Sequence, residues 1–214
     1  MSQPVAAAAI VHAWGNLRSY RAAPGGHVQD LEALAREAQG GNRGAFSLLY
    51  EAMFDRVYRY ILVRVGSAAD AEDLAQEVFL RAMRALPSYQ FRGRPFAAWL
   101  FRIAHNTVVD RHRQRGGVVN VSLDDAEPVV SSEDLPQETL LNLDLEQVGK
   151  AMSRITDLQR EVIRCRFIAE LSLAETAEVM DKDVNAIKAL QHAALKSLRR
   201  ELERQPGGMK QERR

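Results

Sequence analysis

The hydrophobic pattern of the chain is helical almost throughout, because apolar residues recur three and four positions apart. Before residue 115 this pattern predicts four amphipathic helices, over residues 30–39, 42–65, 70–85 and 95–114. Glycines follow the first two of these segments, as they often do at a helix C-terminus. Residues 28–115 are therefore predicted to form a four-helix, all-α unit.

A second helical part is predicted over residues 138–204. Thr156 and Ser172 each precede a Gln or Glu by three positions, which is the spacing of a capping box at a helix start. The last two helices, predicted over 173–180 and 184–204, are separated by a three-residue turn. Because the second of them is rich in Lys, Gln, His and Arg, the pair is typical of a helix-turn-helix that binds duplex DNA.

The two helical parts are separated by residues 116–137, which are acidic and predicted to be a flexible linker. Residues 1–27 hold an Ala-rich apolar run that is too short to span a bilayer, and they are expected to be a disordered extension. Residues 205–214 are expected to be a disordered tail. The predicted fold class is thus all-α, with two small helical domains, over 28–115 and 138–204, joined by the acidic linker.

Charge is segregated along the chain, although the formal net charge is only +1. Residues 81–115 hold eight arginines and one acid, a net charge of +7. Residues 116–150 hold one lysine and eight acids, a net charge of −7. Residues 181–214 hold nine basic and five acidic residues, a net charge of +4. Each helical part therefore carries a basic block that suits a nucleic-acid partner.

The sequence holds none of the common patterns of an enzyme or a metal site. It has no Gly-rich phosphate loop, no Ser/His/Asp constellation and no pair of histidines at ligand spacing. We therefore expect no catalytic residue, no metal and no cofactor. Cys165 is the single cysteine and stands within an apolar run, which indicates a small buried side chain and fits a reducing cytoplasm.

Two stretches of the first part are candidate binding surfaces. On the helix predicted from Asp70, acids and Phe79 fall on or beside the face opposite the apolar stripe, and an aromatic among exposed acids often marks a partner surface. In the loop over 88–95, Tyr89 and Phe91 stand beside arginines, and such aromatics can stack on unpaired bases while the charges hold phosphates. A solvated helix face and a basic helix packed on a core have the same compositions, so the residues alone leave both interpretations open.

The same stretches resemble a known family. The segments DAEDLAQEVF at 70–79, FAAWLFRIAHN at 96–106 and DRHR at 110–113 resemble the second conserved region of bacterial sigma factors. They are most similar to the extracytoplasmic-function (ECF) class of the sigma-70 family. Residues 138–203 are similar to the fourth conserved region, although Asp181 stands where the family usually has glycine at the turn. Aspartate tolerates the left-handed conformation, so the turn is expected to form at some cost.

The resemblance implies an alternative sigma factor that binds core RNA polymerase, recognises promoter elements and promotes strand opening. The residues implied to bind the clamp helices of the largest polymerase subunit are Asp70, Asp73, Gln76, Glu77 and Phe79. Those implied to bind the melted minus-ten strand are Tyr89, Phe91, Arg92, Arg94, Arg102, Asn106 and Arg113. Those implied to bind the minus-thirty-five element are Asn185, Lys188, Gln191, His192, Lys196, Arg199 and Arg200.

By the same resemblance, the further partners are the polymerase flap region, promoter DNA and a cognate anti-sigma factor, in the cytoplasm and without membrane insertion. The alternative function is a two-domain helix-turn-helix transcriptional regulator of duplex DNA, in which residues 28–115 sense or dimerise. A third class, an anti-sigma-type interaction protein, has no need of two basic blocks. The block from Arg81 to Arg115 favours the sigma factor, because a sensor domain has no need of an arginine-aromatic loop.

Overall fold

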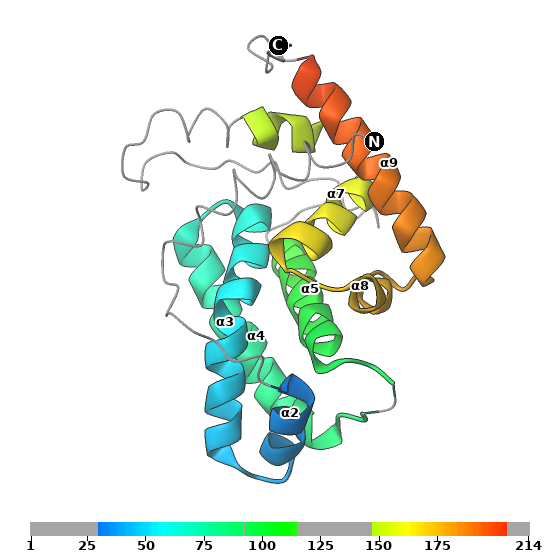
Figure 1. The fold of residues 1–214 in the computed structure, drawn as a ribbon. Helices are drawn as coiled ribbons and strands as arrows, with labels where there is room; N and C mark the ends of the chain where they lie inside the picture. Colours follow the sequence, from blue (N-terminus) through cyan, green and yellow to red (C-terminus); the bar gives the residue numbers. More distant parts are fainter. Residues whose placement is uncertain (1–29, 92, 115–146, 205–214) are drawn as a thin grey trace, which may run out of the picture.

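The computed structural model describes residues 30–91, 93–114 and 147–204, and their regular structure is helical (Figure 1). The first part contains α2 (Leu31–Gln39), α3 (Arg43–Val65), α4 (Ala68–Ala85), a 3-10 turn (Leu86–Ser88) and α5 (Phe96–Gln114). The second part contains a helical stretch over 147–153, α7 (Asp157–Ile163), a π-helical turn (Arg164–Ile168), α8 (Leu173–Met180) and α9 (Val184–Glu203). The all-α prediction is confirmed.

Four predicted features lie wholly or partly outside the described residues. The expected N-terminal extension, the acidic linker and the C-terminal tail all lie outside these residues, as does the start of the predicted second domain at 138–146. Among the described residues, no helix is long and apolar enough to cross a bilayer.

Local side-chain hydrogen bonds set the helix starts. Asp30 accepts from two backbone N–H groups and caps α2, and Asn42 accepts from one and caps α3. Complete capping boxes at Thr156 and Ser172 begin α7 and α8, as their spacing predicts. Gly66 ends α3 in the left-handed conformation, with φ at 74°.

The turn between α8 and α9 has the predicted length and the predicted strained residue. Asp181 adopts the left-handed conformation, with φ at 54°. The backbone N–H of Lys182 donates to the carbonyl of Ala177 at 3.0 Å and closes the end of α8. Asp183 then accepts from the backbone N–H of Ala186 at 2.9 Å and caps α9. A helix-turn-helix therefore forms although aspartate replaces the family's usual glycine.

The helices of the first part enclose one apolar core. α3 packs against α2 and α4, and α5 packs against α4 and α3. Fully buried side chains of this core are Leu49, Met53, Val57 and Ile61 of α3, Leu74 and Val78 of α4, and Leu100 and Phe101 of α5. On α3 they recur every four residues, as the hydrophobic pattern predicts.

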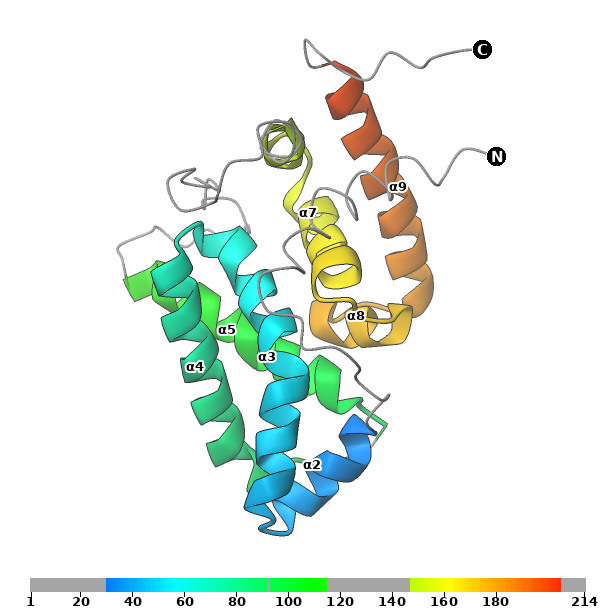
Figure 2. The same ribbon diagram turned by 60° about the vertical axis from the view of Figure 1, so that its left-hand side comes forward.

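The second part packs against the first. The π-helical turn lies on α3 and α8 lies on α5, while α9 forms the outer edge (Figures 1 and 2). Four residues of the second part, Cys165, Ala169, Leu171 and Val179, belong to the same buried cluster as the core of α3 and α5. A separate cluster fills the interior of the second part, between α7, α8 and α9. The sequence predicted the two parts but not this contact between them.

Candidate polymerase and nucleic-acid interfaces

The acidic face of α4 lies partly in solvent and partly in ion pairs. Asp73 and Gln76 are exposed, as predicted. Glu77 accepts from the Arg81 guanidinium at 2.6 Å, and the same guanidinium donates to Asp110 of α5 at 2.9 Å. Glu77 therefore helps to tie α4 to α5, whereas Asp73 remains available to a partner.

Phe79 does not lie on the exposed acidic face, contrary to the prediction. Its side chain is only 4% exposed, and its ring centroid is 4.7 Å from that of Tyr50 and 6.1 Å from that of Phe54. The reason is that position 79 is one helical turn from Ala75 and Ala82, so it widens the apolar stripe toward α3.

An apolar groove lies directly beside Phe79, between α3 and α4. It has a volume of about 320 Å³ and is lined by Phe46, Tyr50, Gln76, Phe79, Leu80 and Met83. Leu80 is 49% exposed and Met83 is 50% exposed. Exposed apolar side chains beside a hollow of this kind are typical of a protein-docking surface. The sequence analysis missed Leu80 and Met83, although their positions on the polar side of α4 were a usable signal.

The loop over 88–95, which was predicted to stack on bases, packs its aromatic side chains against other residues of the protein. Tyr89 is 8% exposed, its hydroxyl donates to the carbonyl of Arg94 at 2.6 Å, and its ring lies 4.7 Å from the Trp99 ring. Burial raises the pKa of Tyr89 to about 12. The Gln39 amide donates to the carbonyls of Leu86 and Tyr89 and holds the loop on α2. The Tyr89 ring therefore supports the loop from within in this conformation, and its stacking on a base stays a prediction that requires these contacts to break.

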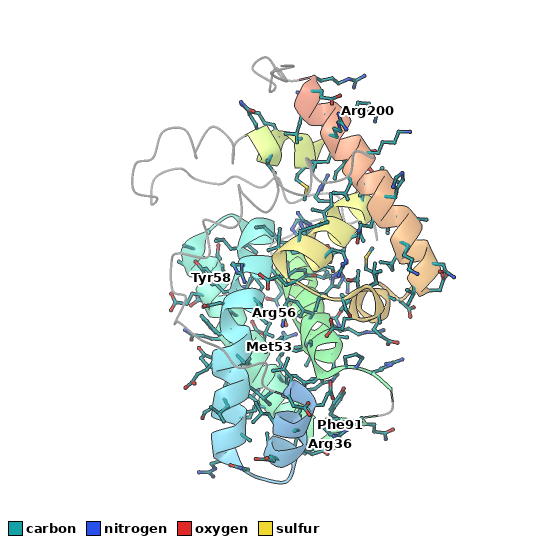
Figure 3. The ribbon with its side chains drawn as sticks, viewed as in Figure 1. Arg36, Met53, Arg56, Tyr58, Phe91 and Arg200 are labelled. Carbon is teal, nitrogen blue, oxygen red and sulfur yellow. The ribbon has the colours of Figure 1, made fainter. Side chains whose placement is uncertain are left out.

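Phe91 is half-buried, and the Arg36 guanidinium of α2 covers its ring at 5.1 Å from the centroid (Figure 3). The Tyr89 ring is a second neighbour of Phe91, at a centroid distance of 4.7 Å. One ring face is thus taken by a cation rather than open to a base. Arg92 lies outside the described residues.

The basic side of α5 is exposed where the sequence predicted it. Arg102, Asn106 and Arg113 are all exposed, and they share one face because their separations of four and seven residues are close to whole helical turns. Arg94, at the entrance to α5, is 61% exposed and pairs with Glu178 of α8 at 3.2 Å. The structure thus brings together two cations and an amide that can hold phosphates and a base edge.

The outer side of α9 carries most of the predicted minus-thirty-five residues. Those exposed along it are Asn185, Lys188, His192, Lys196 and Arg200. Arg199 is half-buried, and its guanidinium donates to Glu203 one turn later at 2.8 Å. This outer face has the charge and the spacing needed to enter a major groove.

Gln191 is the exception on α9. It stands one turn after buried Ile187, and its Oε1 accepts from the Arg166 guanidinium of the π-helical turn at 2.8 Å. A guanidinium can only donate, so the amide oxygen faces inward. In this structure the Gln191 oxygen is therefore engaged within the protein, where the amide links α9 to the π-helical turn.

A buried cluster of charges joins the two parts, and the sequence analysis missed it. Glu161 of α7 is 2% exposed and pairs with Arg64 of α3, while the Tyr60 hydroxyl donates to Glu161 at 2.7 Å. His105 of α5 lies 3.5 Å from the same carboxylate. Burial by itself raises the pKa of Glu161, but the charges and hydrogen bond of Arg64, His105 and Arg164 together outweigh burial and hold this pKa well below its usual value. A usable signal was the position of Arg64 and Glu161 among the apolar residues of their helices.

Comparison with known proteins identifies the family. Residues 49–118 match the family model of Sigma-70 region 2, and residues 151–200 match that of Sigma-70, region 4. The chain is 43% identical over 171 residues to the ECF RNA polymerase sigma factor BldN of Streptomyces coelicolor, covering 78% of this chain and 64% of BldN. It is 36% identical over 186 residues to the ECF RNA polymerase sigma factor SigD of Mycobacterium tuberculosis, covering 80% of this chain and 84% of SigD. The chain belongs to the ECF RNA polymerase sigma factors.

Solved sigma-factor structures have the same fold. The structure of CnrH in complex with the cytosolic domain of CnrY has a TM-score of 0.63 and 25% identity, covering 83% of this chain and 99% of CnrH. The sigma factor RpoE from Bartonella quintana, solved with the anti-sigma factor NepR, has a TM-score of 0.58 and 23% identity, covering 75% of this chain and 98% of RpoE. Sigma factors are transcription initiation factors rather than enzymes, so the matches confirm the predicted sigma factor and do not support the duplex-binding regulator.

Proposed function

We propose that this sigma factor docks on core RNA polymerase through the groove between α3 and α4 and the acidic face of α4. We propose also that it reads promoter DNA with α5 and α9. The observation that carries the proposal is the separation of two kinds of surface. An apolar groove lies between α3 and α4, and Asp73 is exposed on α4, whereas exposed cations lie on α5 and α9. The first face suits the clamp helices of the largest subunit, and the second suits DNA.

The roles of the two domains follow from these two surfaces. Residues 28–115 act as the core-binding and minus-ten domain, and residues 138–204 act as the minus-thirty-five domain that also meets the flap region. The protein works in the cytoplasm, where polymerase and promoter are found. A cognate anti-sigma factor is a further partner, supported by the similarity to RpoE, which was solved with one. An exposed groove on the polymerase-binding face offers such a partner a place to compete.

In-vitro transcription with purified core polymerase on a promoter library tests the proposal as a whole. Transcripts that depend on this chain, from templates sharing two sequence elements, are the expected result. Binding of duplex DNA without any transcript that depends on this chain would contradict the proposal. That result would favour the helix-turn-helix regulator instead.

Strand opening is expected to depend on the exposed amide of α5. Asn106→Ala removes one base-edge contact, worth on the order of 1–3 kcal/mol, and should reduce opening while polymerase binding stays intact. Permanganate reactivity of minus-ten thymines on a closed and on a pre-opened template measures the effect. Gln114→Ala, at the end of the same helix, is the matched control and should open the promoter like the parent. Equal opening by Asn106→Ala and the parent would exclude this residue from the melting surface.

On α9, the outer and the inner side chains are expected to behave differently. Lys188→Ala should weaken binding evenly across promoter sequences and should flatten the salt dependence by about one unit, because a single phosphate contact is lost. Gln191→Ala should leave base preference unchanged, since its amide faces Arg166. Binding to a panel of minus-thirty-five variants at several salt concentrations separates these outcomes. A change of preference at one base in Gln191→Ala would show that the amide turns outward on DNA.

A further inference from the structure

The α4–α5 loop, which joins the 3-10 turn at Leu86 to α5 at Phe96, is contacted by one face of α2. Glu32, Arg36 and Gln39 stand four and three residues apart, so their side chains project from the same side of this helix. Each of them contacts a different part of the loop or its junction with α5. Neither the predicted binding sites nor the proposed function gives these three residues a role.

Gln39 holds the beginning of the loop. Its amide nitrogen donates to the carbonyl of Leu86 at 2.9 Å and to that of Tyr89 at 2.7 Å. A primary amide has two N–H donors, so both are used here. The two carbonyls belong to one tight turn, because the backbone N–H of Tyr89 also donates to the carbonyl of Leu86 at 3.0 Å. The backbone at this end of the loop is therefore fixed on α2.

Glu32 and Arg36 hold the middle and the far end of the loop. The Glu32 carboxylate accepts from the backbone N–H of Phe96, the first residue of α5. Backbone N–H groups in the first turn of a helix have no partner inside the helix, so Glu32 supplies a cap for α5 from another helix. The Arg36 guanidinium lies over the Phe91 ring, a cation–π contact that orients the ring (Figure 3).

Contacts within the loop add to this support. The Tyr89 hydroxyl donates to the carbonyl of Arg94, so the two sides of the loop are joined. Gly93 has φ at 70°, and its backbone N–H donates to the carbonyl of Phe91 at 3.0 Å. Glycine adopts this conformation without the strain that a side chain would cause. The loop is therefore ordered by contacts that exist before any DNA binds.

The ordered loop presents one exposed amide to solvent. Gln90 stands between Tyr89 and Phe91, whose rings are both in contact with the protein, and its own side chain is exposed. Within the described part of the chain, this amide has no hydrogen-bond partner. A primary amide can donate to and accept from one base edge at the same time. Because the backbone on both sides of position 90 is fixed, the amide has a defined starting position.

We propose that α2 is the scaffold of the α4–α5 loop, with Glu32, Arg36 and Gln39 as positioning residues that make Gln90 selective for a base of the melted strand. The inference rests on the proposed function for the DNA that the loop binds. A loop that is already ordered loses little conformational entropy on binding, so the scaffold strengthens the contact to the base. Phosphate contacts made by α5 do not depend on the loop, and they should not change when the scaffold is removed.

Substitutions of Gln39 separate its donors from its bulk. Gln39→Met keeps the length of the side chain but cannot donate, whereas Gln39→Lys can donate to both carbonyls again. The complex of each full chain with core polymerase is titrated with a single-stranded oligonucleotide carrying the minus-ten sequence from the promoter library, and with the same strand made abasic at its most selective position. Gln39→Met should bind the intact strand about tenfold more weakly and the abasic strand like the parent. Gln39→Lys should recover most of the loss.

Three further variants test the scaffold away from Gln39. Arg36→Gln changes an exposed side chain, so the fold should survive, and it should weaken binding of the intact strand about two- to threefold. Gly93→Ala strains the loop from within and should resemble Gln39→Met, because the added Cβ meets nothing within 4 Å and only the backbone is disturbed. Glu37→Gln is the control on α2, since its carboxylate accepts from Asn42 and not from the loop, and it should bind like the parent.

A double-mutant cycle tests whether α2 acts through Gln90. Gln90→Ala should weaken binding of the intact strand at least about fivefold in the parent, but less than about twofold in Gln39→Met, because the released loop no longer positions the amide. Trp99 reports on the loop independently of DNA, since its ring lies against that of Tyr89. Trp14→Phe leaves Trp99 as the single tryptophan, and acrylamide quenching of its fluorescence should increase when Gln39→Met is added.

The outcomes separate the scaffold from a purely structural role and from the proposed function. Equal weakening of the intact and abasic strands by Gln39→Met, or a loss of core-polymerase affinity, would show a general defect and overturn the positioning role. Unchanged quenching of Trp99 would also overturn it. Equal effects of Gln90→Ala in both backgrounds would overturn action through this amide. A parent complex that binds intact and abasic strands equally would instead count against the proposed function, while increased quenching in Gln39→Met would still support the scaffold.

Discussion

Aspartate at positions 80 and 83 is expected to weaken binding to core RNA polymerase by at least about 100-fold. Leu80 and Met83 are half-exposed beside the groove, so the double variant Leu80→Asp, Met83→Asp removes apolar contact and places two charges that docking must desolvate. A 100-fold loss corresponds to about 2.8 kcal/mol, a small cost for two desolvated carboxylates. Fluorescence titration of core polymerase with the labelled sigma factor measures the affinity.

The matched control is Leu48→Asp, because Leu48 is 40% exposed on α3 but does not line the groove. It should bind core polymerase like the parent. Thermal unfolding should be nearly unchanged in both variants, since none of the altered side chains is buried. Parent-like affinity in the folded double variant would show that polymerase does not use the groove. Asp73→Arg would then be the next variant to test, because Asp73 is exposed on the acidic face of α4.

Removal of the Arg160 side chain is expected to destabilise the second part by about 3–5 kcal/mol. Its guanidinium is 7% exposed and donates to the carbonyls of Met152, Ser153 and Ile155, at 2.9, 3.3 and 3.1 Å. It also pairs with Asp157 at 3.2 Å. Arg160→Ala leaves these buried carbonyls unsatisfied at the corner that leads into α7. Urea unfolding of the full chain, followed by circular dichroism, measures the loss.

Two variants sharpen the test of this corner. Arg160→Lys keeps the charge but lacks the planar fork, so it should recover only part of the stability. Arg154→Ala removes an exposed arginine from the same connection and should change the free energy of unfolding by less than about 0.5 kcal/mol. Core-polymerase binding through the first part should survive in Arg160→Ala. Equal stability of Arg160→Ala and Arg154→Ala would show that water replaces the guanidinium at these carbonyls.

The sequence correctly predicted which site residues are exposed where the helical period alone decides exposure. Arg102, Asn106 and Arg113 share a face of α5, and Lys188 and Lys196 share a face of α9, as predicted. The period alone misjudged residues at the border of an apolar stripe. Phe79 and Gln191 each stand one turn from buried positions, and only the neighbouring helix decides whether such a side chain faces solvent.

What the sequence by itself determined is the local architecture: the helices, their caps and the left-handed turn at Asp181. These features depend on hydrogen bonds between residues a few positions apart, so the local pattern contains the information. Only the tertiary structure decided that Tyr89 supports the loop and that Glu161 meets Arg64. The two members of that ion pair are 97 residues apart in the chain. The hydrophobic period of a helix cannot predict such an ion pair. The pair forms only when the two domains pack together and bury the charged residue that each carries among its apolar residues.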